Sequence, residues 1–288
     1  MFDKIQKFLD KKSDLPKLIV VYWPTACGKT ALSLDIAEKF GWEIIGADSR
    51  QIYKYLNIWT WKIKEEEKRW IKHHMIDFLD PDKEYSVWEY KKTAIPLIRE
   101  IFASWKIPIL CGWTGLYIDS IIYNFQIPEI EPDWQYREEL EKIRLEKWND
   151  FLWQMLSNLD PEYARTIHPN NYRYVQRGLE IKQKTWKSKQ EMKNKEEKIF
   201  DYLLISPDFS DREVLYNRIN SRIDQMFEDW LIGEVQEILK LWYKKNCFWL
   251  NTIWYKEIIN YLDWEVGLEE PREIIKKYNR NYAKRQIT

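Results

Sequence analysis

An apolar strand, a short loop and a helix follow one another between Leu18 and Phe40, in the segment LIVVYWPTACGKTALSLDIAEKF. The loop approaches the spacing GxxxxGK(S/T), in which backbone N–H groups turn onto phosphate oxygens and glycine permits the close approach. Gly28, Lys29 and Thr30 fit this spacing, but Trp23 stands at its first glycine. The segment therefore predicts a phosphate-binding loop at residues 23–30, provided that position 23 is glycine.

Tryptophan is unusually frequent in this chain, and glycine is unusually rare. There are 17 Trp and 8 Gly among 288 residues, whereas glycine makes up about 7% of an average protein. Several tryptophans also stand in glycine-like contexts, such as Trp113 in CGWTGLY, where an indole would be strained or exposed without evident benefit. We hypothesise that many of these codons are UGA, which the source organism reads as glycine. The alternative is a genuinely Trp-rich protein.

Size, charge and cysteine content narrow the class of protein. A chain of 288 residues with 45% hydrophobic residues can hold one large or two modest domains. Lys plus Arg equals Asp plus Glu at 46 each, so any polyanion site must be a local patch. Cys27, Cys111 and Cys247 match no metal or redox spacing, which favours a reducing compartment. No signal sequence or long apolar run is evident, so we expect a cytoplasmic protein without a membrane segment.

Apolar runs alternate with helical patterns along the chain. We expect strands at Leu18–Tyr22, Glu43–Gly46, Ile107–Cys111 and Tyr202–Ser206, and a helix from about Lys29 to Phe40. Strands that alternate with helices indicate parallel pairing. The sequence therefore predicts an α/β fold in which helices flank a parallel sheet, as in P-loop NTPases.

Residues 133–200 differ from the rest, with long Glu- and Lys-rich segments of helical spacing and no strand signal. We interpret them as a helical insertion between a first part of the core, residues 1–132, and its completion by residues 201–288. The run Lys182–Lys198 is typical either of a nucleic-acid contact or of a solvated helix face. In the last part, Arg and Lys recur on one face of the helical segments.

Two further motifs follow predicted strands. GADSRQIY places Asp48 at the carboxyl edge of the sheet, where it could be a general base, a Mg²⁺ partner or a helix cap. CGWTGLY places Thr114 between glycine-like positions, which suits close approach to a ligand or merely a tight turn. In HHMIDFLDP the adjacent side chains of His73 and His74 diverge, so a structural role is favoured over a metal site.

Taken together, these motifs resemble one family, the tRNA dimethylallyltransferases or isopentenyl-pyrophosphate transferases. The family has GPTASGKT, ADSRQ(V/I)Y, DIGT, HHLID, PILVGGTGLY and IGYKE in that order, followed by a terminal KRQ. This chain has WPTACGKT, ADSRQIY, NIWT, HHMIDFLDP, PILCGWTGLY, TIWYKEI and AKRQIT in the same order. The resemblance covers nearly the whole chain, and so many ordered motifs are very specific.

The resemblance implies transfer of a dimethylallyl group from dimethylallyl diphosphate to N6 of the adenosine on the 3′ side of the tRNA anticodon. The implied catalytic residues are Asp48 as base for the flipped adenosine, Lys29 at the leaving diphosphate and Thr114 in the channel wall. Mg²⁺ is the implied cofactor, held by Thr30. The implied diphosphate-binding residues are Trp23, Pro24, Thr25, Ala26, Cys27, Gly28, Lys29 and Thr30. The implied tRNA-binding residues are Asp48, Ser49, Arg50, Gln51, Thr114, Arg137, Arg173 and Arg177.

The family commonly has glycine where this chain has tryptophan. The positions concerned are Trp23, Trp42, Trp59, Trp70, Trp105, Trp113, Trp148, Trp186, Trp230, Trp254 and Trp264. The helix RYVQRGLE departs from the family pattern at Tyr174 and Gly178, and Cys27 replaces a serine. We expect dimethylallyl diphosphate and the tRNA anticodon stem-loop as partners, a monomer, and a chain that stops short of the family's last segment.

Two other functions stay open at this point. A small-molecule kinase could use the same loop and Asp48, although the ADSRQ and KRQ motifs would then lack a reason. If the tryptophans are real, indoles at 23 and 113 would abolish diphosphate affinity and leave an inactive RNA-binding remnant. ATP turnover without tRNA would favour the kinase. Binding of dimethylallyl diphosphate by the chain with tryptophan at 23 and 113 would contradict the expectation that the indoles abolish this affinity.

Overall fold

The computed structural model describes residues 1–22, 27–125, 130, 133–188, 197–207, 211–241, 243, 255–263, 267 and 269–287, with only the backbone at 282 and 285–287. The chain forms two compact units. The first joins Met1–Ile122 to Ile199–Thr288, and the second is Tyr123–Lys198. The phosphate-binding motif and Asp48 belong to the first unit.

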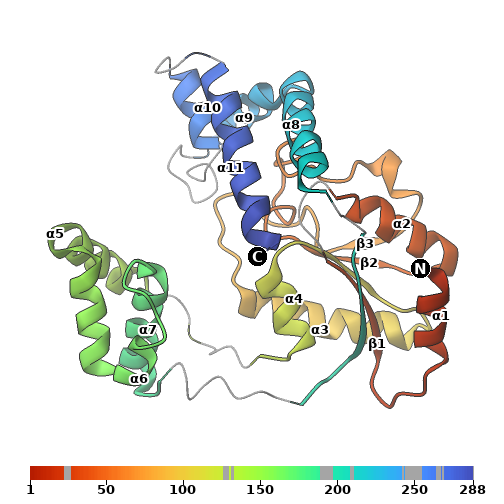
Figure 1. Ribbon diagram of the computed structural model, residues 1–288, viewed down its shortest axis with the longest axis horizontal. Coiled ribbons are helices and arrows are strands. Elements are labelled where there is room, and N and C mark those ends of the chain that lie inside the picture. Colours follow the sequence, from red (N-terminus) through yellow and green to blue (C-terminus); the bar gives the residue numbers. More distant parts are fainter. Residues whose placement is uncertain are drawn as a thin grey trace. The chain divides into compact units, whose positions relative to one another are not determined.

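A five-stranded sheet forms the centre of the first unit (Figure 1). The strands are β1 (Lys17–Tyr22), β2 (Ile44–Ala47), β3 (His73–His74), β4 (Ile109–Gly112) and β5 (Asp201–Ile205). Their order is β3-β2-β4-β1-β5, and every neighbouring pair is parallel. The predicted parallel sheet is confirmed, with strand ends within two residues of the expected ones. The edge strand β3 was not predicted.

Helices cover both faces of this sheet (Figure 1). They are α1 (Phe2–Asp10), α2 (Lys29–Phe40), α3 (Val87–Ala103) and α4 (Gly115–Ile122), with a 3-10 turn, η1 (Glu65–Lys68), between β2 and β3. Ile19 and Val21 of β1 pack with residues of α1 and α2, whereas Leu18 and Val20 pack with α3 and α4. Because successive side chains of a strand point to opposite faces, the apolar run Leu18–Val21 of β1 is buried on both sides of the sheet.

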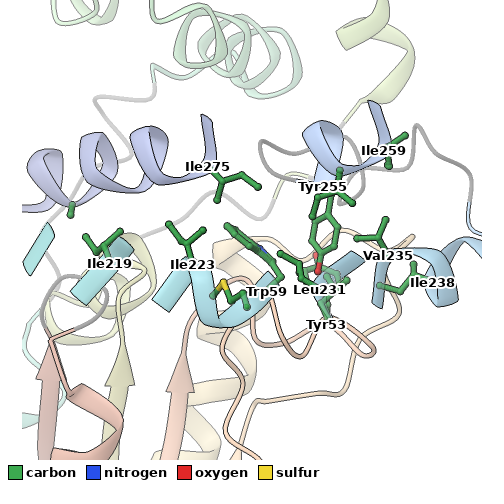
Figure 2. Packing of buried hydrophobic residues seen from close by; sticks show 14 of the residues in the cluster. Tyr53, Trp59, Ile219, Ile223, Leu231, Val235, Ile238, Tyr255, Ile259 and Ile275 are labelled. Atoms are coloured by element: carbon green, nitrogen blue, oxygen red, sulfur yellow. The ribbon is translucent and has the colours of Figure 1, made fainter. Parts of the chain in front are cut away.

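The described part of the first unit also contains the helices α8 (Arg212–Glu228), α9 (Leu231–Lys240), α10 (Tyr255–Leu262) and α11 (Glu269–Ile287). They share an apolar cluster with the segment that follows β2, including Tyr53 and Trp59. Figure 2 shows Ile219 and Ile223 of α8 directed into this cluster, close to Ile275 of α11. The buried stripe of α8 fixes the rotation of that helix and so decides which side chains its other face presents.

The second unit is helical, with α5 (Trp134–Leu159), α6 (Pro161–Ala164) and α7 (Tyr172–Thr185), and no strand among its described residues. Leu140, Leu152 and Leu179 lie in its core. The predicted helical character is confirmed there, whereas the predicted segment 189–196 lies outside the described residues. Within the described parts of both units, no helix is long and apolar enough to span a lipid bilayer.

Candidate functional site

The carboxyl ends of three neighbouring strands bring the sequence motifs together. Gly112 of β4 pairs with Tyr22 of β1 on one side and with Ala47 of β2 on the other. A Cβ atom at Gly112 would come within 2.2 Å of the Ala47 carbonyl oxygen, so only glycine permits this approach. Gly28 and Lys29 of the predicted phosphate-binding loop, the segment that begins at Asp48 and the segment that begins at Trp113 lie at one edge of the sheet. Open α/β sheets bind their ligands at this edge.

A cavity of about 840 Å³ opens at this edge. The residues that line it include Gly28, Lys29, Thr30, Asp48, Arg50, Gln51, Gly112, Trp113, Arg218 and Arg222. The candidate residues Trp23, Pro24, Thr25 and Ala26 lie outside the described part of the chain. The structure thus gathers three of the expected motifs around one space and adds two arginines from α8.

Lys29 is the cation at the start of α2. Gly28 precedes the helix with φ of +88°, a conformation that glycine adopts readily. Burial lowers the pKa of the Lys29 ammonium, while the nearby Cys27, Cys111 and Asp48 partly offset this effect. The Lys29 Nζ atom lies 4.0 Å from Cys27 Sγ. A partly buried ammonium beside a helix N-terminus forms a site suited to phosphate oxygens.

Asp48 is almost fully buried, with 6% of its surface exposed. Its Oδ1 atom accepts a hydrogen bond from the Arg50 backbone N–H at 2.8 Å, as in a turn cap. Its Oδ2 atom accepts one from the indole N–H of Trp113, closer than a normal hydrogen bond. Burial raises the pKa of the Asp48 carboxyl above its ordinary value. One oxygen therefore holds the turn, and the indole occupies the other, which a base would need for its substrate.

Thr114 joins the ends of β2 and β4. Its hydroxyl accepts a hydrogen bond from the Ser49 backbone N–H at 2.9 Å and lies 3.2 Å from the Ser49 hydroxyl. Its own N–H donates to the Ala47 carbonyl at 3.1 Å. Thr114 thus fixes the backbone next to Asp48, whichever ligand the cavity takes.

Gln51 and a buried acid of α9 hold the opposite wall of the cavity. The Gln51 amide donates to the carbonyls of Thr60 and Trp61, at 3.0 and 3.2 Å. The segment before these carbonyls is held by Glu234, which accepts hydrogen bonds from the backbone N–H groups at positions 57, 58 and 59, two of them at 2.7 Å. The Tyr255 hydroxyl donates to the same carboxylate at 3.2 Å. Sequence reasoning missed Glu234, which lies more than 170 residues away from this segment.

The comparisons with known proteins decide the family. Residues 51–288 match the IPP transferase family. The chain belongs to this family. A tRNA dimethylallyltransferase of a Thermoanaerobacter species is 42% identical over 279 residues, which cover 94% of this chain and 88% of the relative. That of Acetivibrio thermocellus is 43% identical over 277 residues, covering 95% and 88%.

Solved structures give the same result for the fold. The tRNA isopentenylpyrophosphate transferase of Bacillus halodurans is similar with a TM-score of 0.66 and 39% identity, covering 94% of this chain and 85% of that one. A eukaryotic dimethylallyltransferase acting on tRNA gives a TM-score of 0.80 and 32% identity, covering 94% and 69%. The P-loop NTPase-like fold and the family expected from the motifs are confirmed.

Helix α8 supplies two cavity residues that sequence reasoning did not name. Arg218 and Arg222 are four residues apart and therefore lie on one face of the helix. The buried Ile219 and Ile223 follow them in sequence and also line the cavity. Burial lowers the pKa of the Arg222 guanidinium to about 10, against the pull of Asp48 and Cys27. Its guanidinium carbon lies 4.5 Å from the ring centroid of Trp61. The i, i+4 arginine spacing was the available signal.

The three candidate arginines of the second unit have different surroundings. Arg137 makes two hydrogen bonds of 3.0 Å to Glu180, whose side chain is fully buried, and Arg177 pairs with the same carboxylate. Arg173 is exposed, with its guanidinium carbon 6.0 Å from the Tyr172 ring centroid. Two of the three thus stabilise the interior of their own unit, and Arg173 is the one most open to a ligand.

The histidine pair has structural partners. His73 and His74 form β3, which pairs with β2 at the edge of the sheet. The His74 Nε2 atom lies 2.7 Å from Glu43, and the His73 Nδ1 atom lies 2.8 Å from the Ile71 carbonyl oxygen. No group of three or more His, Cys, Asp or Glu side chains that could hold a metal occurs among the described residues.

Proposed function

We propose that this chain transfers the dimethylallyl group of dimethylallyl diphosphate to N6 of the adenosine next to the anticodon of a tRNA. The observation that carries the proposal is one cavity that holds both a buried carboxylate, Asp48, and the cations Lys29, Arg218 and Arg222. A carboxylate can take a proton from the nucleophile while the cations stabilise a departing diphosphate. The curated relatives are named for this reaction.

The diphosphate is assigned to the start of α2. Its oxygens would meet the loop of residues 23–30 and the Lys29 ammonium, with Arg218 and Arg222 on the facing helix. Mg²⁺ fits this arrangement, because the Thr30 hydroxyl lines the same cavity and Mg²⁺ is commonly held by few protein oxygens plus phosphate oxygens and water. When bound, the ion would draw charge from the leaving diphosphate.

The acceptor is an adenine turned out of the RNA stack. Its N6 amine attacks the allylic carbon, the carbon–oxygen bond breaks, and the diphosphate leaves with the bonding electrons. The Asp48 Oδ2 atom takes the amine proton, so Trp113 must not occupy that oxygen. Ser49, Arg50, Gln51 and Thr114 are assigned to the wall around the base.

For the rest of the RNA we assign the second unit, with Arg173 as the first contact residue and Arg137 and Arg177 beside it. A cytoplasmic location and a monomeric state are predictions from the sequence.

The test of the reaction uses a glycine form of the protein, which carries Trp23→Gly and Trp113→Gly. It is incubated with tRNA and dimethylallyl diphosphate labelled in the allyl group, and in parallel with ATP without tRNA. We expect label in the tRNA and no ATP turnover. ATP turnover without any labelled tRNA would support the kinase alternative instead.

The pH dependence of transfer should report Asp48. Because burial raises its pKa, kcat/KM should fall with decreasing pH at a value above the usual pKa of Asp, about 3.9.

The same raised pKa affects stability, because the folded protein binds a proton at Asp48 more tightly than the unfolded chain does. This stabilising contribution is present below the unfolded pKa and is lost as pH rises through the folded pKa. Asp48→Asn should remove transfer and should weaken the pH dependence of stability between the unfolded and the folded pKa of this carboxyl. Transfer that persists in Asp48→Asn with an unchanged acid limb would contradict this assignment.

Arg222→Gln in the glycine form should weaken dimethylallyl diphosphate binding about 10- to 100-fold, since hydrogen bonds to charged groups contribute about 1.5–3 kcal/mol. Isothermal titration calorimetry measures the effect. The matched control is Arg212→Gln, an exposed arginine at the start of the same helix. Equal loss in both variants would mean that general charge, and not the cavity position, determines affinity.

Glu234→Gln should raise the KM for tRNA or lower kcat by roughly 10-fold, because an amide cannot accept all the backbone N–H groups that the carboxylate accepts. Diphosphate affinity should stay unchanged, since Glu234 holds the opposite wall. The control is Glu237→Gln, which removes an exposed pair with Lys240 on the same helix. If diphosphate affinity falls by the same factor as kcat/KM for tRNA, Glu234 stabilises the protein in general instead of holding this wall.

A further inference from the structure

We propose that positions 70, 105, 148, 186 and 230 are glycine in the functional protein, because the folded backbone requires glycine there, and that Trp113 has the same origin. The cause that unites them is a UGA codon read as glycine. For the five positions the inference rests on backbone geometry and does not depend on the proposed reaction. It also separates the tryptophans into two classes, which composition alone could not do.

The backbone dihedral φ is positive at each of the five positions. It is +61° at Trp70, +62° at Trp105, +67° at Trp148, +59° at Trp186 and +76° at Trp230. Positive φ is uncommon for any residue other than glycine, and for bulky residues it is an outlier. Trp61 has the same property, with φ of +51°, but its ring packs beneath Arg222, so we leave it out of the set.

Trp105 ends α3 in the way that a glycine ends a helix. Its N–H donates to the Phe102 carbonyl at 3.0 Å. The N–H of Lys106 donates to the Ile101 carbonyl at 3.3 Å. These two bonds with a left-handed residue between them form a Schellman motif, whose left-handed position is usually glycine. The chain provides its own comparison, because α2 ends at Gly41 with φ of +68°.

Trp186 and Trp230 are at helix ends of the same kind. Trp186 closes α7 with φ of 59° and ψ of 0°, and its N–H donates to the Lys182 carbonyl at 2.9 Å. Trp230 stands between α8 and α9 with φ of 76° and ψ of 32°. Glycine is the residue enriched at such left-handed helix boundaries, because it has no Cβ to clash.

The other two positions are more restrictive. The Ile71 N–H donates to the Lys68 carbonyl at 2.9 Å, and both central residues of this turn, Arg69 and Trp70, have positive φ. That is the type I′ turn, which favours glycine at its second central position. Trp148 interrupts α5 with φ of 67° and ψ of 172°. This region of conformational space is essentially restricted to glycine.

The five indoles lie at the surface, and of them the Trp230 ring lies over Gly233 of α9. Trp70 and Trp105 are 105% and 97% exposed, and the other three are exposed as well. Trp153 is the contrasting case, because its φ is not positive and its ring packs against the core of the second unit. Its indole N–H donates to the carbonyls of Ala164 and Ile167, at 3.1 and 3.0 Å. Trp153 is therefore a true tryptophan.

Position 113 joins the glycine class for a different reason. Its φ is not positive, but its indole crowds the Asp48 carboxylate in the cavity. The buried Trp42 and Trp59 show neither feature, and the geometry assigns them to neither class.

One peptide of the native protein tests the proposal. Trypsin cleaves after Lys147 and Arg165, and the peptide 148–165 contains one member of each class. Mass spectrometry of the protein from its source cells should find glycine at 148 and tryptophan at 153, and the gene should have UGA at the first and UGG at the second. Tryptophan at 148 would overturn the proposal, and glycine at both would overturn the distinction that the backbone draws. The measurement needs no activity, so its failure is separate from failure of the proposed reaction.

Discussion

Trp113→Gly, made in a protein that already carries Trp23→Gly, is expected to raise dimethylallyl transfer by at least about 100-fold, the lower range for a positioned general base. The indole N–H of Trp113 occupies the Asp48 oxygen that must take the amine proton. Glycine at 113 frees that oxygen and opens space beside it in the cavity. Single-turnover transfer of labelled dimethylallyl to tRNA, compared between the two proteins, measures the gain.

The control for this experiment is the same pair of proteins with Asp48→Asn. If the indole acts by blocking the carboxylate, Trp113→Gly should give no gain once the carboxylate is gone. A similar gain with and without Asp48 would mean that Trp113 only narrows the entrance. Transfer by the protein with tryptophan at both 23 and 113 would contradict the assignment of glycine to the site.

Replacing Trp70, Trp105, Trp148, Trp186 and Trp230 by glycine together should stabilise the protein. A large residue held at positive φ costs about 1 kcal/mol or more, so five replacements should contribute on the order of 5 kcal/mol. Typical total stabilities are roughly 5–15 kcal/mol. Differential scanning calorimetry should show higher unfolding temperatures for both units, because Trp148 and Trp186 belong to one and the other three to its neighbour in the chain.

The matched control, Trp153→Gly, should change the stability in the opposite direction. Trp153→Gly removes a packed ring and leaves a cavity, which for large aromatic side chains typically costs about 3–5 kcal/mol. The unfolding temperature of the second unit should therefore fall. If the five-site variant is destabilised as Trp153→Gly is, the positive φ values do not report a need for glycine.

The parts of the fold that local pattern determines could be predicted from sequence. The buried run of β1 and the helix Lys29–Phe40 are consecutive, and their order alone indicates a strand followed by a crossover helix. The edge strand β3 could not be found in this way, because it consists of only two residues, the polar His73 and His74, and no apolar run marks it. Their strand character comes from pairing with β2.

The residues of the site likewise fall into those that local motifs predict and those that only tertiary packing brings together. Lys29, Thr30 and Asp48 follow strand ends within recognisable motifs, so their approach to one edge follows from parallel pairing. Arg222 and Glu234 come from helices far along the chain. Only the packing of α8 brings Arg222 to the cavity, and only the packing of α9 brings Glu234 to the segment before the cavity wall. Apolar periodicity predicts that such helices exist, but not which other segment they will face.

Product identification tests the central claim most directly. The glycine form is incubated with tRNA and dimethylallyl diphosphate, and the tRNA is digested to nucleosides and analysed by mass spectrometry, with Asp48→Asn as control. The account predicts N6-dimethylallyladenosine at the position on the 3′ side of the anticodon, and none with the control. Absence of this nucleoside from a folded glycine form that binds both substrates would contradict it.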